Sequence, residues 1–139
     1  MEKILSRINP GLLLHFIVRR NDFIHGRQDL IEPDNFLQCS MLNLGKGKTF
    51  QPHQHIWKNR KEGRVIAQES WVVIKGWVKV FFYDTDDQLI KTAVLGAGDA
   101  SYTLQGGHNY EILEDDTRVY EFKTGPYEGQ EKDKVFINE

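Results

Sequence analysis

The chain has 139 residues, a formal net charge of −2 and a single cysteine, Cys39. The length fits one domain over residues 1–139, and the near-neutral charge argues against a nucleic-acid partner or an anionic membrane surface. No apolar run reaches the roughly 20 residues of a membrane helix, and residues 1–7 are too charged for a signal peptide. Because a lone cysteine cannot form an internal disulfide, we expect a cytoplasmic protein. Cys39 lies in a predicted strand with no base beside it in the sequence, so we expect an inert, buried thiol.

Short apolar runs, separated by turn residues, follow one another along most of the chain. We expect residues 1–9 to be a lead-in segment or a short helix, and residues 124–139 to be a polar C-terminal tail with some order near 135–137. The runs between them predict about nine strands, over residues 11–20, 35–44, the segment around His53 and His55, 65–75, 77–84, 88–95, 100–105, 108–113 and 117–123. This pattern predicts an all-β, antiparallel sandwich or small barrel.

Two histidines, His53 and His55, lie two positions apart in one of these strands. Side chains alternate along a strand, so both point to the same face with Cβ atoms roughly 6–7 Å apart. That separation allows both to bind one metal ion, although a solvent-exposed face is the simpler explanation for an isolated pair. The pair therefore needs support from other residues.

Two residues at the starts of later strands supply that support. Glu69 shares a strand face with Trp71 and Val73, where a carboxylate is costly unless it is paired or bound to a metal. His108 stands at the head of another strand. A carboxylate at the strand's rim and an exposed turn histidine are the alternatives. Three histidines and a carboxylate suit one divalent transition metal, such as Fe, Mn, Ni or Zn.

The spacing around these residues resembles the first motif of the cupin superfamily. That motif runs glycine, five residues, His-x-His, three or four residues, glutamate, six residues, glycine. Gly47 precedes His53 at the expected spacing, and Gly76 follows Glu69 at the expected spacing.

The middle of the motif differs from the family pattern. Thirteen residues separate His55 from Glu69, and we interpret this segment, Ile56–Gln68, as an inserted hairpin or a widened loop. Glu62, inside the segment, is the rival carboxylate ligand. The segment also carries four basic side chains between residues 57 and 64, which could hold an anionic group of a substrate or form a solvated tip.

The second motif of the family is matched mainly by Gly98 and His108. Thr103, Gln105 and Ile112 stand where the family has proline, glycine and asparagine. The resemblance implies a jelly-roll, double-stranded β-helix barrel, often dimeric in this superfamily, so a homodimer is expected. It also implies that four residues hold one metal at the mouth: His53, His55, Glu69 and His108.

Two more side chains are candidates for handling a substrate. Gln51 shares the face of His53 and can hydrogen-bond a ligand, and Tyr110 shares the face of His108. For Tyr110, core packing is an equally good explanation.

Three functions remain open at this stage. The first is a metal-dependent enzyme acting on a small polar metabolite such as a sugar, by isomerase, epimerase or oxygenase chemistry. The second is a non-catalytic cupin that binds a small ligand. The third is a metal-free sugar-nucleotide isomerase or epimerase, in which a histidine is the base and a tyrosine the acid.

Overall fold

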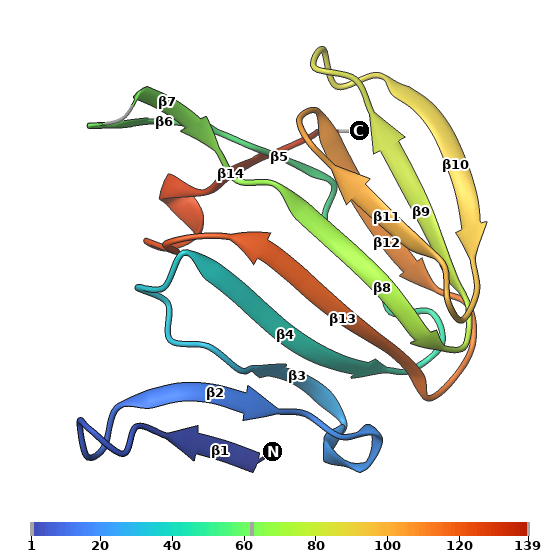
Figure 1. Cartoon of the computed structure of the whole chain (residues 1–139). Helices are drawn as coiled ribbons and strands as arrows, with labels where there is room; N and C mark the ends of the chain where they lie inside the picture. The colour runs from blue at the N-terminus through green and yellow to red at the C-terminus, as the bar shows by residue number, and fades with distance from the viewer. Residues whose placement is uncertain (1, 62, 139) are drawn as a thin grey trace.

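The computed structural model describes residues 2–61 and 63–138. Their regular structure is almost entirely β (Figure 1). The strands are β1 (Glu2–Leu5), β2 (Leu13–Ile17), β3 (Gly26–Asp29), β4 (Leu37–Leu44), β5 (His53–His55), β6 (Trp57–Arg60), β7 (Gly63–Ile66), β8 (Glu69–Lys75), β9 (Val78–Tyr83), β10 (Leu89–Leu95), β11 (Ala100–Thr103), β12 (Gly107–Ile112), β13 (Thr117–Thr124) and β14 (Lys134–Phe136). Two 3-10 turns complete the set, η1 (Arg20–Asp22) and η2 (Gln130–Lys132). Neither turn, in the part of the chain the structure describes, has the length and apolar character of a membrane-crossing helix.

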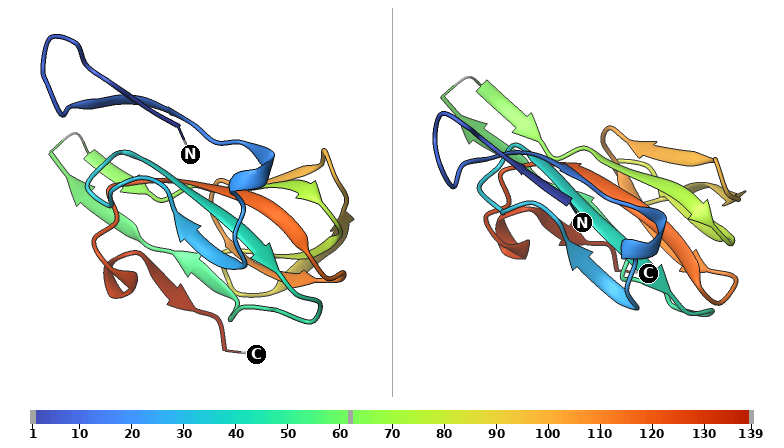
Figure 2. Two further views of the ribbon diagram at one scale, coloured as in Figure 1. Left: turned by 90° about the horizontal axis from the view of Figure 1, so that it is seen from below. Right: turned by 60° about the horizontal axis from the view of Figure 1, so that its bottom comes forward.

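Two five-stranded antiparallel sheets form the body of the molecule (Figures 1 and 2). One has the order β11-β8-β13-β4-β3 and the other the order β10-β9-β12-β5-β14. Several neighbours in each sheet are far apart in sequence, as β12 between β9 and β5 illustrates, and this is how a jelly roll is wound. The predicted all-β antiparallel class is confirmed.

The core lies between the two sheets, because alternate residues of each strand point inward. One cluster of buried side chains combines both sheets: Leu42, Leu44, Trp71, Val73, Val78, Val80, Tyr110, Ile112 and Val119. Gly76 makes the tight turn between β8 and β9 with φ of 80°, and a Cβ there would lie 2.3 Å from Thr117 Oγ1. Gly76, the second glycine of the first motif, is therefore required by both the backbone conformation and the space available.

The segment Ile56–Gln68 is a hairpin, as one of the two sequence interpretations held. Strands β6 and β7 pair only with each other and project from the barrel (Figure 1). The predicted strand 65–75 is wrong in its extent, because the chain breaks at Ala67 and Gln68 into β7 and β8. The Gln68 carbonyl accepts a hydrogen bond from the Thr124 amide at 3.0 Å, which ties the base of the hairpin to β13.

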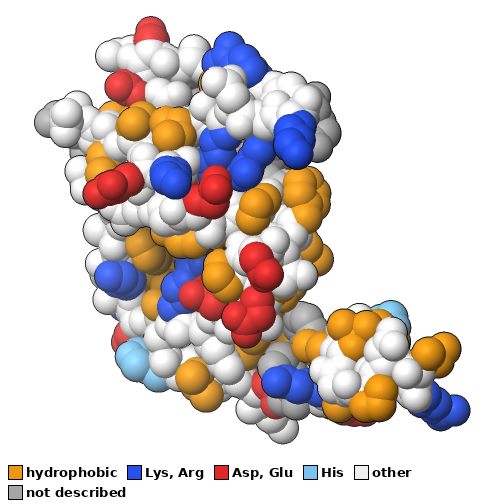
Figure 3. All heavy atoms as spheres, turned by 90° about the vertical axis from the view of Figure 1, so that its left-hand side faces the viewer, with side chains coloured by type: hydrophobic (Ala, Val, Ile, Leu, Met, Phe, Trp, Pro, Cys, Tyr) orange, Lys and Arg blue, Asp and Glu red, His pale blue; other side chains and the backbone are white. Residues whose placement is uncertain are grey.

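Both ends of the chain are more ordered than their composition indicates. The segment expected as a lead-in or short helix contains β1, which pairs with β2. This outer hairpin exposes several aliphatic side chains and projects from the body in Figure 3 (Ile4, Leu5, Ile8, Leu12, Leu13 and Leu14). The segment expected as a polar tail contains η2 and β14, and β14 is an edge strand paired with β5.

Candidate metal centre

The four residues selected from the sequence meet in one buried cluster. His53 and His55 come from β5, Glu69 from the start of β8 and His108 from β12. Each offers a ligand atom, and these atoms all lie within 4.8 Å of one another. The exposed fraction of each residue is at most 7%. The alternative of solvent-exposed histidines is therefore wrong for all three.

Strand register explains why residues so distant in sequence converge. β12 pairs with β5 so that His108 stands opposite His53. Glu69 enters from the facing sheet, held by β8 pairing with β11 and β13 on either side. The inserted hairpin leaves this pairing undisturbed, because it turns outward before β8 begins. Glu62, the rival carboxylate, lies outside the described residues.

Backbone and side-chain contacts orient the two histidines of β5. The Nδ1–H group of His53 donates to the Gln51 carbonyl at 3.1 Å, which leaves Nε2 available as a ligand. His55 Nδ1 lies 3.2 Å from Asp133 Oδ2 and 3.3 Å from the Asp133 carbonyl oxygen. Because both partners are acceptors, Nδ1 carries the proton and Nε2 faces the cluster.

The surroundings of the cluster shift the pKa values of His53 and His55 in opposite directions. Burial, together with the nearby charges of His108 and Lys134, lowers the pKa of His53 to about 3. Burial also opposes charge on His55, but hydrogen bonds with Asp133 and Glu69 outweigh it and raise its pKa. Burial would raise the pKa of Glu69, yet the imidazoles of His108 and His55, whose Nε2 atoms lie 3.2 and 3.3 Å from its carboxylate, hold it well below its usual range. Glu69 is thus an anion at neutral pH, available to a cation.

His108 provides the test of whether a metal fits these residues. It is fully buried, and neither ring nitrogen makes a well-oriented hydrogen bond within residues 2–61 and 63–138. Its Nε2 has one close neighbour, Glu69 Oε1 at 3.2 Å. A buried imidazole nitrogen without a hydrogen bond is costly, and a metal ligated by Nε2 would satisfy it. The donor set, three imidazoles and one carboxylate, is one that divalent transition metals prefer.

Asp133 is the functional residue that the sequence did not reveal. It is 1% exposed and accepts from Lys58 Nζ at 2.9 Å and Lys123 Nζ at 2.9 Å, besides His55. These contacts hold its pKa far below the usual range despite burial. It lies in a polar segment with no strand pattern, so nothing local indicated its position. Strand β14 brings it there by pairing with β5.

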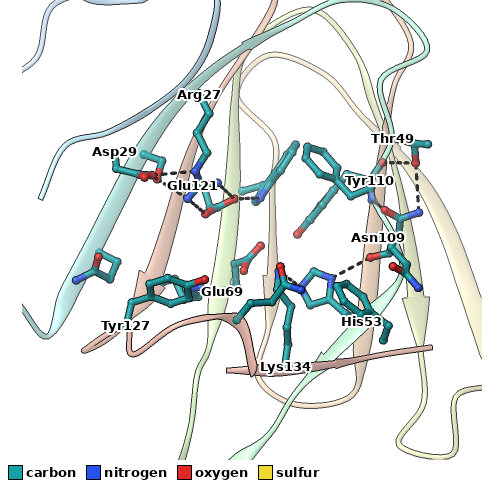
Figure 4. Close-up of a pocket in the computed structure, with 18 of the residues that line it drawn as sticks. Arg27, Asp29, Thr49, His53, Glu69, Asn109, Tyr110, Glu121, Tyr127 and Lys134 are labelled. Carbon is teal, nitrogen blue, oxygen red and sulfur yellow. Dashed lines mark hydrogen bonds and ion pairs between the residues drawn. The ribbon is translucent and has the colours of Figure 1, made fainter. Parts of the chain in front are cut away.

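A cavity of about 730 Å³ opens beside the cluster, and His53 and Glu69 form part of its wall (Figure 4). Trp71 and Tyr110 stack with centroids 3.9 Å apart on another side. Arg27 donates two hydrogen bonds, of 3.0 and 2.8 Å, to Glu121, and Trp71 Nε1 donates to the same carboxylate. The cavity is therefore lined by charged, polar and aromatic groups together.

Both candidate substrate residues line this cavity. Gln51 is exposed, so its amide is free to reach a ligand, and its backbone carbonyl orients His53. Tyr110 is 2% exposed, and its hydroxyl lies 3.0 Å from Ser101 Oγ. Burial raises the pKa of Tyr110, with the Glu69 charge adding to it. Their catalytic roles stay predictions.

The basic hairpin does not line the cavity in the described part of the chain. Lys58 pairs with Asp133, and Arg60 Nη2 lies 2.9 Å from Glu128 Oε2. Two of the four basic side chains of the hairpin are therefore paired with carboxylates of the C-terminal segment of the same chain. The cationic side chains that do line the cavity are Arg27, Lys48, Lys123 and Lys134.

Comparison of the structure with solved proteins identifies the architecture. An uncharacterised protein with a double-stranded β-helix domain from Klebsiella pneumoniae aligns over 88% of this chain and 91% of its own, with a TM-score of 0.57 and 15% identity. The chain has the cupin fold. KdgF from Halomonas aligns over 70% of this chain and 76% of its own, with a TM-score of 0.54 and 22% identity.

A third similar structure is larger than this chain. CapF, solved with the inhibitor 3-isopropenyl-tropolone, aligns over 97% of this chain but 37% of its own, with a TM-score of 0.66 and 18% identity. The chain thus spans little more than a third of CapF. No protein-family model matches the sequence, and no curated protein matches it either.

Proposed function

We propose that this protein is a metal-dependent cupin that acts on a small polar metabolite in the cavity beside His53. The observation that carries the proposal is the buried cluster of three histidines and one glutamate, with ligand atoms within 4.8 Å of one another. Divalent Fe, Mn, Ni or Zn is the metal expected from these donors. A bound ion would act as a Lewis acid toward a carbonyl or hydroxyl oxygen.

The chain's own residues would perform the remaining tasks. The Gln51 carbonyl and Asp133 fix the tautomers of His53 and His55, so that each presents Nε2. The Trp71–Tyr110 stack closes one wall and excludes water. Gln51 is placed to hydrogen-bond a substrate at the open side. Sugars or sugar derivatives suit a cavity with so many hydrogen-bonding groups, and isomerase, epimerase or oxygenase chemistry is proposed for this site.

The deciding experiment is elemental analysis of protein purified without added metal, followed by titration of chelator-treated protein with Mn²⁺ and Zn²⁺. We expect one metal per chain. His108→Ala should abolish stoichiometric binding, whereas His25→Ala, an exposed histidine outside the cluster, should leave it unchanged. Absence of stoichiometric metal, with no thermal shift on adding Fe, Mn, Ni or Zn, contradicts the proposal.

Two alternative functions are distinguished by further measurements. Glu69 lies 3.2–3.3 Å from two histidines, an arrangement that a metal-free acid–base enzyme could also use. Turnover that survives chelation would favour that enzyme. Metal or ligand binding without turnover across a panel of metabolites would favour a non-catalytic binding cupin.

We also propose that the chain forms a homodimer. Support comes from the β1–β2 hairpin, whose aliphatic side chains are exposed, Ile8 at 90%. A second copy is the partner that would cover them. Sedimentation equilibrium should give twice the chain mass, and Ile8→Lys with Leu14→Lys should give the monomer. Ile90→Lys, on exposed strand β10, is the matched control.

A further inference from the structure

Each carboxylate that lines the cavity already has a close basic partner within the chain. Glu121 and Asp29 both bind Arg27, with contacts of 2.8 Å each. Glu69 contacts His55 and His108. The carboxylates of the wall therefore have partners before any substrate enters.

The lysines that line the cavity differ in whether they are paired with a carboxylate. Lys123 is paired with Asp133 at 2.9 Å, and Lys48 is an exposed side chain over the ring of Phe50. Lys134 is half-buried and has no carboxylate within 4.0 Å among residues 2–61 and 63–138. Its close polar neighbour is a nitrogen, His53 Nε2, at 3.5 Å.

The position of Lys134 is fixed by the sheet. In the pairing of β14 with β5, Lys134 stands opposite His55, and Phe136 stands opposite His53. Figure 4 shows Lys134 rising from β14 toward His53, on the side of the cavity that Glu69 also faces. Its ammonium group therefore faces the position where the proposed metal would be held.

The ammonium group of Lys134 and a metal held at His53 Nε2 would repel each other in this partly buried site. A singly charged anion that contacts both would relieve the repulsion and satisfy the donors of Lys134. A dianion is less favourable, because Glu69 and Glu121 face the same cavity. A carboxylate fits these conditions, and a neighbouring hydroxyl or keto oxygen gives it a second ligand atom for the metal.

We propose that Lys134 anchors the carboxylate of the substrate, and that the substrate class is a small 2-hydroxy- or 2-oxocarboxylate. This inference rests on the proposed metal-dependent function and gives it a substrate class. In this role Lys134 is a substrate-binding residue. It lies outside the basic segment 57–64, which the sequence indicated as the place for an anionic group.

The test uses the purified full chain loaded with one equivalent of Mn²⁺, with metal content measured first. Isothermal titration with glycolate is compared with titration by glycolamide, its neutral counterpart, and by inorganic phosphate. The variants are Lys134→Met and Lys134→Gln, with Lys48→Met as the matched control from the cavity rim. Thermal melting confirms that each variant is folded.

We expect glycolate to bind the wild type and Lys48→Met alike, and to bind both Lys134 variants at least about tenfold more weakly, with metal content unchanged. Glycolamide should bind about as weakly to wild type as glycolate does to the variants. Equal glycolate affinity in wild type and the Lys134 variants, no glycolate binding to the wild type, or tighter binding of phosphate than of glycolate overturns the proposal.

A failure of the metal function is distinguishable from a failure of this inference. If the wild type holds no metal, the metal-dependent function fails, and the same titrations are read on the metal-free protein. Glycolate binding that is lost in the Lys134 variants then still supports the carboxylate anchor. Unchanged or absent binding overturns it there as well.

Discussion

Asp133 and His55 are 78 positions apart, yet the Asp133 carboxylate lies 3.2 Å from the Nδ1 atom of His55. The Asp133 carbonyl oxygen contacts the same nitrogen at 3.3 Å. A carboxylate that accepts from a ligand histidine fixes its tautomer, orients its ring and raises its basicity toward a metal. The segment around Asp133 thus belongs to the candidate metal centre, although it offers no atom to the ligand cluster.

Replacing Asp133 with asparagine should weaken metal binding. Asp133→Asn keeps the shape but loses the charge that stabilises the ring of His55, so we expect Mn²⁺ or Zn²⁺ affinity to fall by about 10–100-fold. Competition titration against a chromophoric chelator measures the change. Asp86→Asn, on an exposed turn, is the control and should bind as wild type does. Equal affinities for both variants would show that Asp133 does not support the centre.

Two variants decide whether Glu69 or Glu62 is the carboxylate ligand of the proposed metal. Glu69→Ala should abolish stoichiometric metal, because Glu69 is the buried carboxylate of the cluster. Glu62→Ala should retain one metal per chain. Elemental analysis of both variants after dialysis checks this, and the reverse pattern would assign the fourth ligand to Glu62.

Metal affinity should rise with pH. The raised pKa of His55 means that a proton must leave this residue before its Nε2 can bind a metal, whereas His53, with a pKa of about 3, is already neutral. Below the pKa of His55, affinity should change by about tenfold per pH unit. Titrations between about pH 5.5 and pH 8 measure the slope. A flat profile would contradict the assignment of His55.

The same shift has an opposite consequence for the metal-free protein. A histidine whose folded pKa is raised stabilises the fold below its unfolded pKa, and loses that contribution as pH rises through the folded value. The metal-free chain should therefore lose this part of its stability toward alkaline pH, while metal binding strengthens. Urea unfolding of chelated protein over the same pH range checks the sign.

Removing one cation from Asp133 should lower stability. Lys58 and Asp133 have side chains 12% and 1% exposed, so their contact is shielded from water. Lys58→Met leaves Lys123 and His55 to compensate, and we expect a loss of about 1–2 kcal/mol in the free energy of unfolding. Lys61→Met, on the exposed tip of the hairpin, is the control. Urea denaturation that gives equal midpoints would show that the β6 contact is dispensable.

The four residues of the candidate metal cluster could be predicted because each is marked locally. His53 and His55 share a face by strand parity alone, and glycines at fixed spacings flank the motif residues. Asp133 and Lys134 could not be predicted, because the short strand β14 has no alternating apolar pattern and is placed by its pairing with β5. The break between β7 and β8 was missed for a related reason: β-favouring residues run on through Val65 and Ile66 with no glycine or proline before Glu69.

Strand β14 has a dynamic consequence through its place at the edge of its sheet. It pairs with a single neighbour over three residues, and edge segments with few contacts open at a lower free-energy cost than the strands behind them. Opening of β14 alone would carry Lys134 away from His53 and loosen Asp133, while β5, β8 and β12 kept the four ligands in place. Hydrogen exchange should then be faster at Lys134–Phe136 than at Gly107–Ile112, and the contacts that tune the centre would fluctuate independently of the barrel that holds it.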